Sequence, residues 1–273
     1  MDGPRVVSQD EWLAARKELL AKEKAATHAR DELSASRRAL PMVEVTKKYV
    51  FTGPGGEVSL LDLFEGRRQL IVYHFMWRHA ESGFPGEDQG CPTCSFLVDS
   101  IGDPAHLHYC DTTLALVSRA PIASIERHRQ RMGWPLPWYS SYGSDFNYDF
   151  HTSFDTGIAP LEYNYMDAAT LERTAPYIRS GTDAFGTSVF LREDARVFHT
   201  YSAYGRGVDG LINTYNWLDL TPLGRQRHVA EFQYHDSYDA STGSVRDRSR
   251  CWRRRSDRPG GEIRSAPVSE AHS

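Results

Sequence analysis

The spacing of apolar and polar residues first predicts a long N-terminal helix. Ser8 followed by Glu11 matches a capping box, in which the Ser side chain accepts from a backbone N-H three residues on and the Glu side chain reaches back. Residues 12–40 are rich in the helix formers Ala, Leu, Glu, Lys and Arg, with few large apolar side chains. Pro41 ends this helical arm.

Apolar runs of strand length follow the arm. A continuous apolar run such as residues 70–76 is typical of a strand buried on both faces, as in a parallel sheet. Strands are predicted at residues 42–45, 48–52, 70–76 and 112–117, a helix after Cys91, and a second helix at 122–132. The first half of the domain therefore has the order β-α-β-α after two short strands.

The second half combines a long loop with a hairpin and a helix. Residues 134–139 lead into a third strand, and residues 142–154 are aromatic and acidic with little periodicity, which indicates a functional loop. A hairpin is predicted at 187–191 and 196–201, and residues 208–218 have helical spacing. We expect three parts: a helical arm at 1–41, a compact domain at 42–238, and a disordered basic tail at 239–273.

Composition restricts the classes of partner. The chain has 273 residues, 40% hydrophobic and 25% charged, with a net charge of -4, so there is no global attraction for nucleic acid or an anionic membrane surface. No run of about 18 apolar residues and no apolar leader core is present, which predicts a soluble, cytoplasmic protein. Four cysteines do not form a dense disulfide scaffold, and a reducing cytosol keeps thiols reduced.

The segment Cys91-Pro92-Thr93-Cys94 carries the candidate chemistry. Pro92 is favoured in the first turn of a helix, so Cys91 lies at the helix N-terminus, where unpaired N-H groups stabilise a thiolate. Cys91 is then the nucleophile, and Cys94 resolves the mixed disulfide. Zinc is the alternative, because Cys91, Cys94, His106 and Cys110 approach a zinc-ligand spacing. It requires residues 102–104 to reverse the chain, since a helix of ten residues is about 15 Å long.

Several longer motifs support a resemblance to one family. They are YHFM (73–76), CPTCSF (91–96), VSRAP (117–121), RMGW (131–134), SSYGSDFNYDF (140–150), VFHTY (197–201) and LDLTPLGR (218–225). In this order they resemble the DUF899 family, described as predicted dithiol-disulfide oxidoreductases. The resemblance implies an α/β thioredoxin-like fold in its peroxiredoxin-like variant, with a central mixed β-sheet flanked by helices and an N-terminal helical extension. One departure is that Gly186-Thr187-Ser188 stands where thioredoxins usually have a cis proline, which offers Thr187 to a substrate.

Other candidate residues lie near the predicted sheet edge and in the long loop. Arg119 follows a parallel strand and can approach the thiolate, and Arg78 or His79 can act as its electrostatic partner. The loop offers groups that bind a polar ligand or transfer protons: Tyr142, Asp145, Asn147, Tyr148, Asp149 and His151. Each has a structural alternative, namely a surface ion pair, solvated loop charge or local turn bonding.

The sequence supports weaker predictions for two further histidines and two further cysteines. His74, inside an apolar strand, is expected to be a hydrogen-bonded core residue, and His199 is a possible pocket or metal residue sharing one face with Val197 and Tyr201. Cys110 is expected to be a small buried hydrophobe, and Cys251 an exposed thiol in the tail.

The leading hypothesis is a thiol-disulfide oxidoreductase that uses Cys91 and Cys94, needs no bound cofactor or metal, and takes a protein or small-molecule disulfide together with a cellular reductant. A peroxide substrate is a variant. The rival is a non-redox thioredoxin-like module that binds a metal or small ligand through residues 142–151. A third possibility is a homo-oligomer that associates through Trp12 and the arm. The sequence identifies neither the physiological substrate nor the electron donor.

Overall fold

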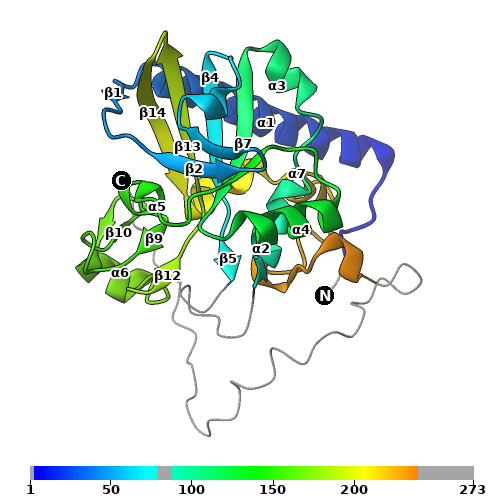
Figure 1. Cartoon of the computed structure of the whole chain (residues 1–273). Helices are drawn as coiled ribbons and strands as arrows, with labels where there is room; N and C mark the ends of the chain where they lie inside the picture. The colour runs from blue at the N-terminus through cyan, green and yellow to red at the C-terminus, as the bar shows by residue number, and fades with distance from the viewer. Residues whose placement is uncertain (1–2, 79–87, 239–273) are drawn as a thin grey trace, which may run out of the picture. The chain divides into compact units, whose positions relative to one another are not determined.

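The computed structural model describes residues 3–78 and 88–238 (Figure 1). The predicted tail at 239–273, including Cys251, and His79 lie outside the described residues. Contacts within the chain divide it into two units, Met1–His235 and Asp236–Ser273, and apart from the bounds of one short 3-10 turn everything below concerns the first. The predicted boundaries at 41/42 and 238/239 stay predictions.

A mixed sheet of eight strands forms the centre of the first unit. The strands β4, β7 and β8 run parallel to one another, and the other neighbours pair antiparallel. Their order across the sheet is β1-β14-β13-β4-β7-β8-β2-β3. Their bounds are β1 (Val43–Glu44), β2 (Val50–Gly53), β3 (Gly56–Ser59), β4 (Gln69–His74), β7 (Thr112–Ser118), β8 (Trp138–Ser140), β13 (Gly186–Glu193) and β14 (Arg196–Tyr204).

The order of the central strands confirms the predicted fold class. Strand β4 is followed by α2 (Pro92–Val98) and the parallel strand β7, and the hairpin β13–β14 then extends the sheet on the other side of β4. The resulting order β14-β13-β4-β7 is that of a thioredoxin-like fold (Figure 1). A helix after β7, α4 (Ile122–Met132), has the predicted bounds and leads to β8.

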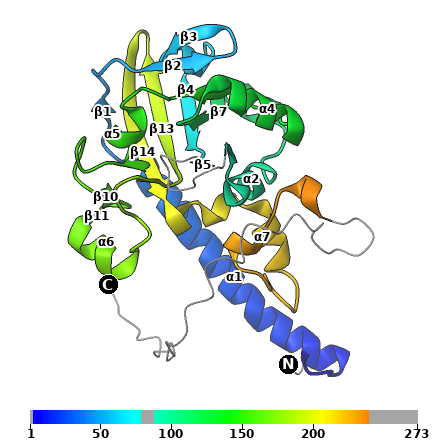
Figure 2. The same cartoon turned by 60° about the horizontal axis from the view of Figure 1, so that its bottom comes forward.

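Alternation along β4 divides the core into two layers, because successive strand residues point to opposite faces. Tyr73 belongs to the cluster that contains both cysteines and residues of α2 and α4, whereas Leu70 and Val72 pack with Phe146 of α5 (Phe146–Asp149). Helices α2 and α4 therefore cover one face of the sheet, and α5 covers the other (Figure 2).

The N-terminal helix α1 (Gln9–Arg38) has the predicted capping box, with Ser8 and Glu11 bonded in both directions. No residue of this helix is buried, and Trp12 and Leu19 are each about half exposed. The helix is confirmed, whereas self-association through it stays a prediction. In the described part of the chain, no helix is long and apolar enough to cross a bilayer.

The segment between β8 and β13 is more structured than the sequence pattern predicted. Residues 142–154 contain α5 and β9 (Ser153–Phe154), and a third apolar cluster forms around Phe154, Tyr163 and Leu171. These elements have two to seven residues, too short for a period to be visible. The others are β10 (Glu162–Tyr163), β11 (Met166–Asp167), α6 (Ala168–Thr174) and β12 (Thr182–Asp183).

The chain after β14 is helical, as predicted, but in short pieces. The spacing at 208–218 corresponds to a 3-10 helix, η3 (Gly205–Leu211), and α7 (Asn213–Leu218), separated at Ile212. Two further 3-10 turns, η4 (Val229–Glu231) and η5 (His235–Ser237), follow. The remaining elements are η1 (Asp62–Phe64), β5 (Trp77–Arg78), β6 (Gln89–Gly90) and α3 (Ala105–Tyr109).

Candidate dithiol site

Backbone pairing at the end of β4 brings the two cysteines beside the central strands. After β4 the chain forms β5, which pairs antiparallel with β6, so that Gly90 lies opposite Trp77. The Cys91 N-H donates to the Met76 carbonyl at 3.1 Å. Cys91 therefore lies directly beside the end of the central strand, as the strand-to-helix interpretation predicts.

The helix α2 begins at Pro92 with Cys91 as its N-cap residue, in extended conformation. The Ser95 N-H donates to the Cys91 carbonyl at 2.9 Å, and the Ser95 hydroxyl donates to the same carbonyl at 3.0 Å. Cys94 thus lies in the first turn, and both thiols lie near N-H groups that have no partner inside the helix.

Burial and hydrogen bonding shift the pKa values of the two thiols in opposite directions. Both are free and buried, with exposed fractions of 5% for Cys91 and 0% for Cys94. A hydrogen bond from the Cys94 thiol lowers the pKa of Cys91, helped by the Arg78 charge and the N-H groups of Cys94 and Thr93, against the opposing effect of burial. Burial raises the pKa of Cys94 well above its ordinary value, and the interaction with Cys91 raises it further.

The Tyr73 side chain reaches the second thiol from the central strand. Its hydroxyl forms a hydrogen bond with Cys94, and Tyr73 is only 2% exposed. Burial followed by the charge and hydrogen bond of Cys94 raises the pKa of Tyr73. Sequence reasoning missed this residue, because a strand buried on both faces shows no alternation that would assign Tyr73 to the face of α2.

His128 of α4 closes the site on the side of β6. Its Nε2 lies 3.4 Å from the Ser95 hydroxyl, and its ring lies so close to Gly90 that a Cβ there would be 2.6 Å from Nε2. Position 90 therefore requires glycine. The rings that surround His128 are those of Phe75, Trp77, Trp134, Trp138 and Tyr234.

The residues 228–235, here called the C-terminal strap, pack across the start of α2. The Tyr234 hydroxyl donates to the Gly90 carbonyl, one residue before Cys91. The Phe232 ring stacks on Phe96 of α2 with centroids 3.9 Å apart. Nothing in the sequence pattern predicted this contact, which joins residues 144 positions apart.

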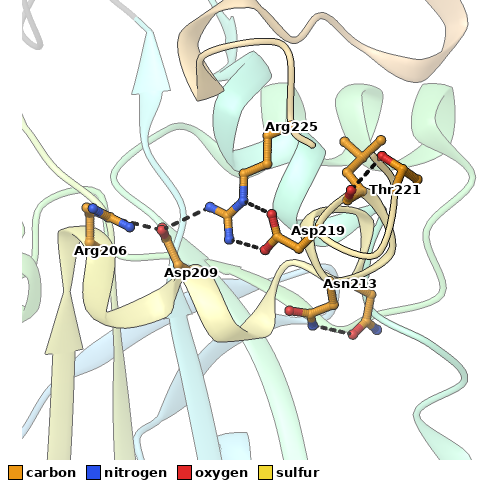
Figure 3. Close-up of polar contacts among 8 residues, drawn as sticks. Arg206, Asp209, Asn213, Asp219, Thr221 and Arg225 are labelled. Carbon is orange, nitrogen blue, oxygen red and sulfur yellow. Dashed lines mark hydrogen bonds and ion pairs between the residues drawn. The ribbon is translucent and has the colours of Figure 1, made fainter. Parts of the chain in front are cut away.

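An ion-pair cluster holds the chain that leads into the strap. Arg225 donates to both carboxylate oxygens of Asp219, at 2.8 and 2.7 Å, and lies 3.5 Å from Asp209, which also pairs with Arg206 (Figure 3). The Arg225 guanidinium also lies 4.1 Å from the centroid of the Tyr215 ring. Because a bidentate Arg-carboxylate pair fixes both distance and orientation, the strap starts from a defined position.

Comparison with protein families identifies the chain. The model of the family "Bacterial protein of unknown function (DUF899)" matches residues 1–257. The chain belongs to the DUF899 family. No curated protein matches the sequence.

Among solved structures, this DUF899 protein is similar to peroxiredoxins. PrxQ from Xylella fastidiosa, as a cysteine-to-serine mutant, has a TM-score of 0.37 at 12% identity over 62% of this chain and 88% of that chain. A cysteine-to-serine mutant of peroxiredoxin Q from Xanthomonas campestris has a TM-score of 0.38 at 12% identity, over 62% and 90%. Similarities at this level carry no argument about what the DUF899 protein does.

Arg119, which the sequence offered as a partner of the thiolate, forms an ion pair with Asp183 instead. Its guanidinium is 3.3 Å from Asp183, and both side chains are largely buried. It also lies 5.6 Å from the centroid of the Tyr148 ring, so two predicted substrate-binding residues come together. The charge that lowers the pKa of Cys91 is that of Arg78, one of the two residues, with His79, that the sequence offered for this role beside the alternative of solvated loop charge.

Thr187 lies directly opposite Tyr73 in the pairing of β13 with β4, and therefore on the face of the cysteines. Its hydroxyl is buried and has no hydrogen-bond partner within the described part of the chain. A buried polar group without a partner is costly, which is consistent with a hydroxyl that receives a ligand atom.

The other predicted loop residues lie elsewhere. Asp145 caps α5 on the opposite face of the sheet from α2 and pairs with Lys47 at 2.8 Å, while Asp149 pairs with the same lysine at 2.6 Å. His151 is partly exposed, 3.9 Å from Glu162, and Tyr142 is half exposed. Substrate binding by these residues stays a prediction.

His74 is the buried, hydrogen-bonded core residue that the sequence predicted. Its Nε2 lies 2.9 Å from the Ser188 hydroxyl, which contacts Ser202 at 2.9 Å, and Ser202 contacts His199 at 2.8 Å. The prediction that His199 shares a face with Tyr201 is wrong. An irregularity between Val189 and Phe190 pairs Tyr201 with the first and His199 with the second, so the two side chains point to opposite faces.

Cys110 is exposed, contrary to the prediction that it is a buried hydrophobe, because it caps the short helix α3 rather than lying in β7. Among residues 3–78 and 88–238, no group of three or more His, Cys, Asp or Glu side chains could hold a metal ion. The four side chains of the zinc alternative, including His106 and Cys110, therefore do not come together.

Proposed function

We propose that this protein is a thiol-disulfide oxidoreductase that uses Cys91 as nucleophile and Cys94 as resolving thiol. The observation that carries the proposal is the pairing of two free, hydrogen-bonded thiols in one helical turn, with the pKa of Cys91 lowered and that of Cys94 raised. The thiolate is the reactive form of cysteine, and a lowered pKa at a helix N-terminus increases the fraction of Cys91 that is thiolate. The raised pKa keeps Cys94 protonated until it is needed.

The reaction balances with these two residues and a disulfide substrate. The Cys91 thiolate attacks one sulfur of the substrate, a Cys91-substrate disulfide forms, and the other half leaves as a thiolate that takes up a proton. The Cys94 thiol then loses its proton and attacks Cys91. The Cys91–Cys94 disulfide forms, and the second half of the substrate leaves as a thiol. Two electrons pass from the protein to the substrate, and a cellular thiol reductant returns them.

We place this chemistry in the cytoplasm, where a reducing poise regenerates the dithiol. The substrate is a protein or small-molecule disulfide. We propose Thr187 and Arg119 as its binding residues, because Thr187 shares the face of the cysteines and Arg119 follows β7 at the edge where parallel strands end.

The test is the two-electron redox titration of the purified protein, followed by disulfide reductase assays of variants. Cys91→Ser is expected to abolish turnover. The control Cys110→Ser, which removes an exposed free thiol, is expected to leave turnover unchanged. A wild-type dithiol that does not oxidise reversibly, or turnover that survives Cys91→Ser, contradicts the proposal.

A further inference from the structure

Tyr73 and Cys94 pack in the same buried cluster, where two groups from β4 and the residues that follow it donate hydrogen bonds to the Cys94 sulfur. One is the Tyr73 hydroxyl and the other is the Met76 backbone N-H, and each favours the thiolate form of Cys94. Tyr73 and Cys94 are both almost completely buried, so water does not compete for the sulfur. Because Tyr73 lies within β4, between parallel and antiparallel partner strands, its position is fixed by the sheet.

This arrangement matters because the environment of Cys94 changes during the proposed reaction. In the dithiol, the Cys94 thiol donates to the Cys91 thiolate, which lowers the pKa of Cys91. Once Cys91 is bonded to substrate, it no longer carries a charge, and Cys94 loses its acceptor. Cys94 must then ionise in an apolar site, where a bare thiolate is strongly disfavoured unless it is hydrogen-bonded.

We propose that Tyr73 donates a hydrogen bond to the Cys94 thiolate in the mixed disulfide and thereby sets the rate at which Cys94 releases the substrate. This inference rests on the proposed function. The tyrosine keeps its proton throughout. The proton of Cys94 is taken up by the departing thiolate or by solvent, the Cys94–Cys91 sulfur bond forms, and the Cys91–substrate bond breaks with both electrons going to the substrate sulfur.

Within the described part of the chain, few titratable groups act on Cys94. Cys91 lies on the same helix, Tyr73 on β4, and Tyr163 of β10 interacts with it through charge. The Tyr163 hydroxyl donates to the Phe185 carbonyl at 2.9 Å and accepts from the Gly205 N-H at 3.0 Å. Tyr163 is thus engaged elsewhere, whereas Tyr73 forms a direct hydrogen bond with the sulfur.

The experiment separates the two steps with Ellman's reagent, whose first coloured thiolate reports attack by Cys91 and whose second reports resolution by Cys94. Tyr73→Phe removes only the hydroxyl. The first phase is expected to stay within about twofold of wild type, and the second to slow by about tenfold or more, as one lost hydrogen bond to a charged group implies. The pH midpoint of the second phase is expected to rise. The matched control is Tyr215→Phe. Tyr215 is a buried tyrosine of α7 whose ring centroid lies 5.4 Å from that of Phe96 in α2, the helix that carries Cys94.

An unchanged second phase in Tyr73→Phe overturns the inference. If wild-type protein releases no second thiolate, the proposed function itself fails, which is a different result. If Tyr73→Phe does not fold, a ring-fluorinated tyrosine at position 73 keeps the shape and donates more strongly. It is expected to shift the pH midpoint of the second phase downward, and an unshifted midpoint then refutes the role of Tyr73.

Discussion

The buried histidine His74 makes the stability of this protein sensitive to acid. Its ring bonds to Ser188 at 2.9 Å and Thr152 at 3.3 Å and stacks on Phe146 with centroids 5.4 Å apart. Burial, and then the nearby His199, lowers the pKa of His74 to about 3. The neutral ring therefore fits the core, and a charged ring does not.

The direction and size of the effect follow from proton uptake on unfolding. The unfolded histidine titrates near pH 6.5, so between that pH and about 3 the unfolded chain binds more protons than the folded one. Stability is then complete above about pH 6.5 and falls as the pH drops through this window. At pH 5 the loss is about 1.5 pH units times about 1.4 kcal/mol, or roughly 2 kcal/mol. His199, whose pKa burial also lowers, adds in the same direction.

Urea unfolding of the wild type at pH 8 and pH 5 measures this loss. His74→Gln keeps a polar side chain that does not titrate, so the difference between the two pH values is expected to shrink by about 2 kcal/mol even if the variant is less stable at both. His28→Gln, on an exposed position of α1, serves as control and is expected to behave like wild type. If His74→Gln loses as much stability as wild type between pH 8 and pH 5, the reasoning about burial is refuted.

Two further predictions concern access to Cys91 and its acidity. Arg78→Gln removes a charge that lowers the pKa of Cys91, so the pH midpoint for alkylation by iodoacetamide is expected to rise, and an unmoved midpoint assigns the low pKa to hydrogen bonds alone. Tyr234→Phe removes the bond to the Gly90 carbonyl, so alkylation of Cys91 at fixed pH is expected to accelerate several-fold with a loss of about 1 kcal/mol in urea unfolding. Equal alkylation rates would show that the strap does not restrict access.

Local signals predicted the position of the dithiol well. The apolar run that became β4, the proline at the first position of α2 and the spacing of the two cysteines are all properties of neighbouring residues. Local rules of strand burial and helix starts are sufficient to place Cys91 at the N-terminus of a helix beside the central strand. The N-terminal helix, with its capping box, was predictable for the same reason.

The surroundings of the dithiol depended on contacts that the sequence pattern does not contain. The strap reaches Gly90 from Tyr234, far along the chain, and the short elements between β8 and β13 fold only by packing on one another around Leu171. The sheet-edge argument favoured Arg119, which contacts Asp183, whereas the loop argument for Arg78 names the charge that acts on Cys91. Rules of sheet topology predict the edge of the sheet at which the Arg119 side chain lies, but not the acidic residue with which it forms an ion pair.

The proposed difference in role between the two cysteines depends on their different surroundings within a single helical turn. The pKa of Cys91 is lowered because its sulfur accepts a hydrogen bond from Cys94 and lies near the Arg78 charge and the N-H groups at the start of α2. The pKa of Cys94 is raised because its thiol is buried and interacts with Cys91, and the hydrogen bond from Tyr73 opposes this shift. Because both residues are cysteines, the difference between their pKa values comes from their positions in the helix and not from residue type. Burial raises the pKa of both thiols, so the difference between them comes from their hydrogen bonds and nearby charges. Because the strap contacts Gly90 and Phe96 on either side of the dithiol, we expect it to slow the approach of a substrate to Cys91, which the Tyr234→Phe variant tests.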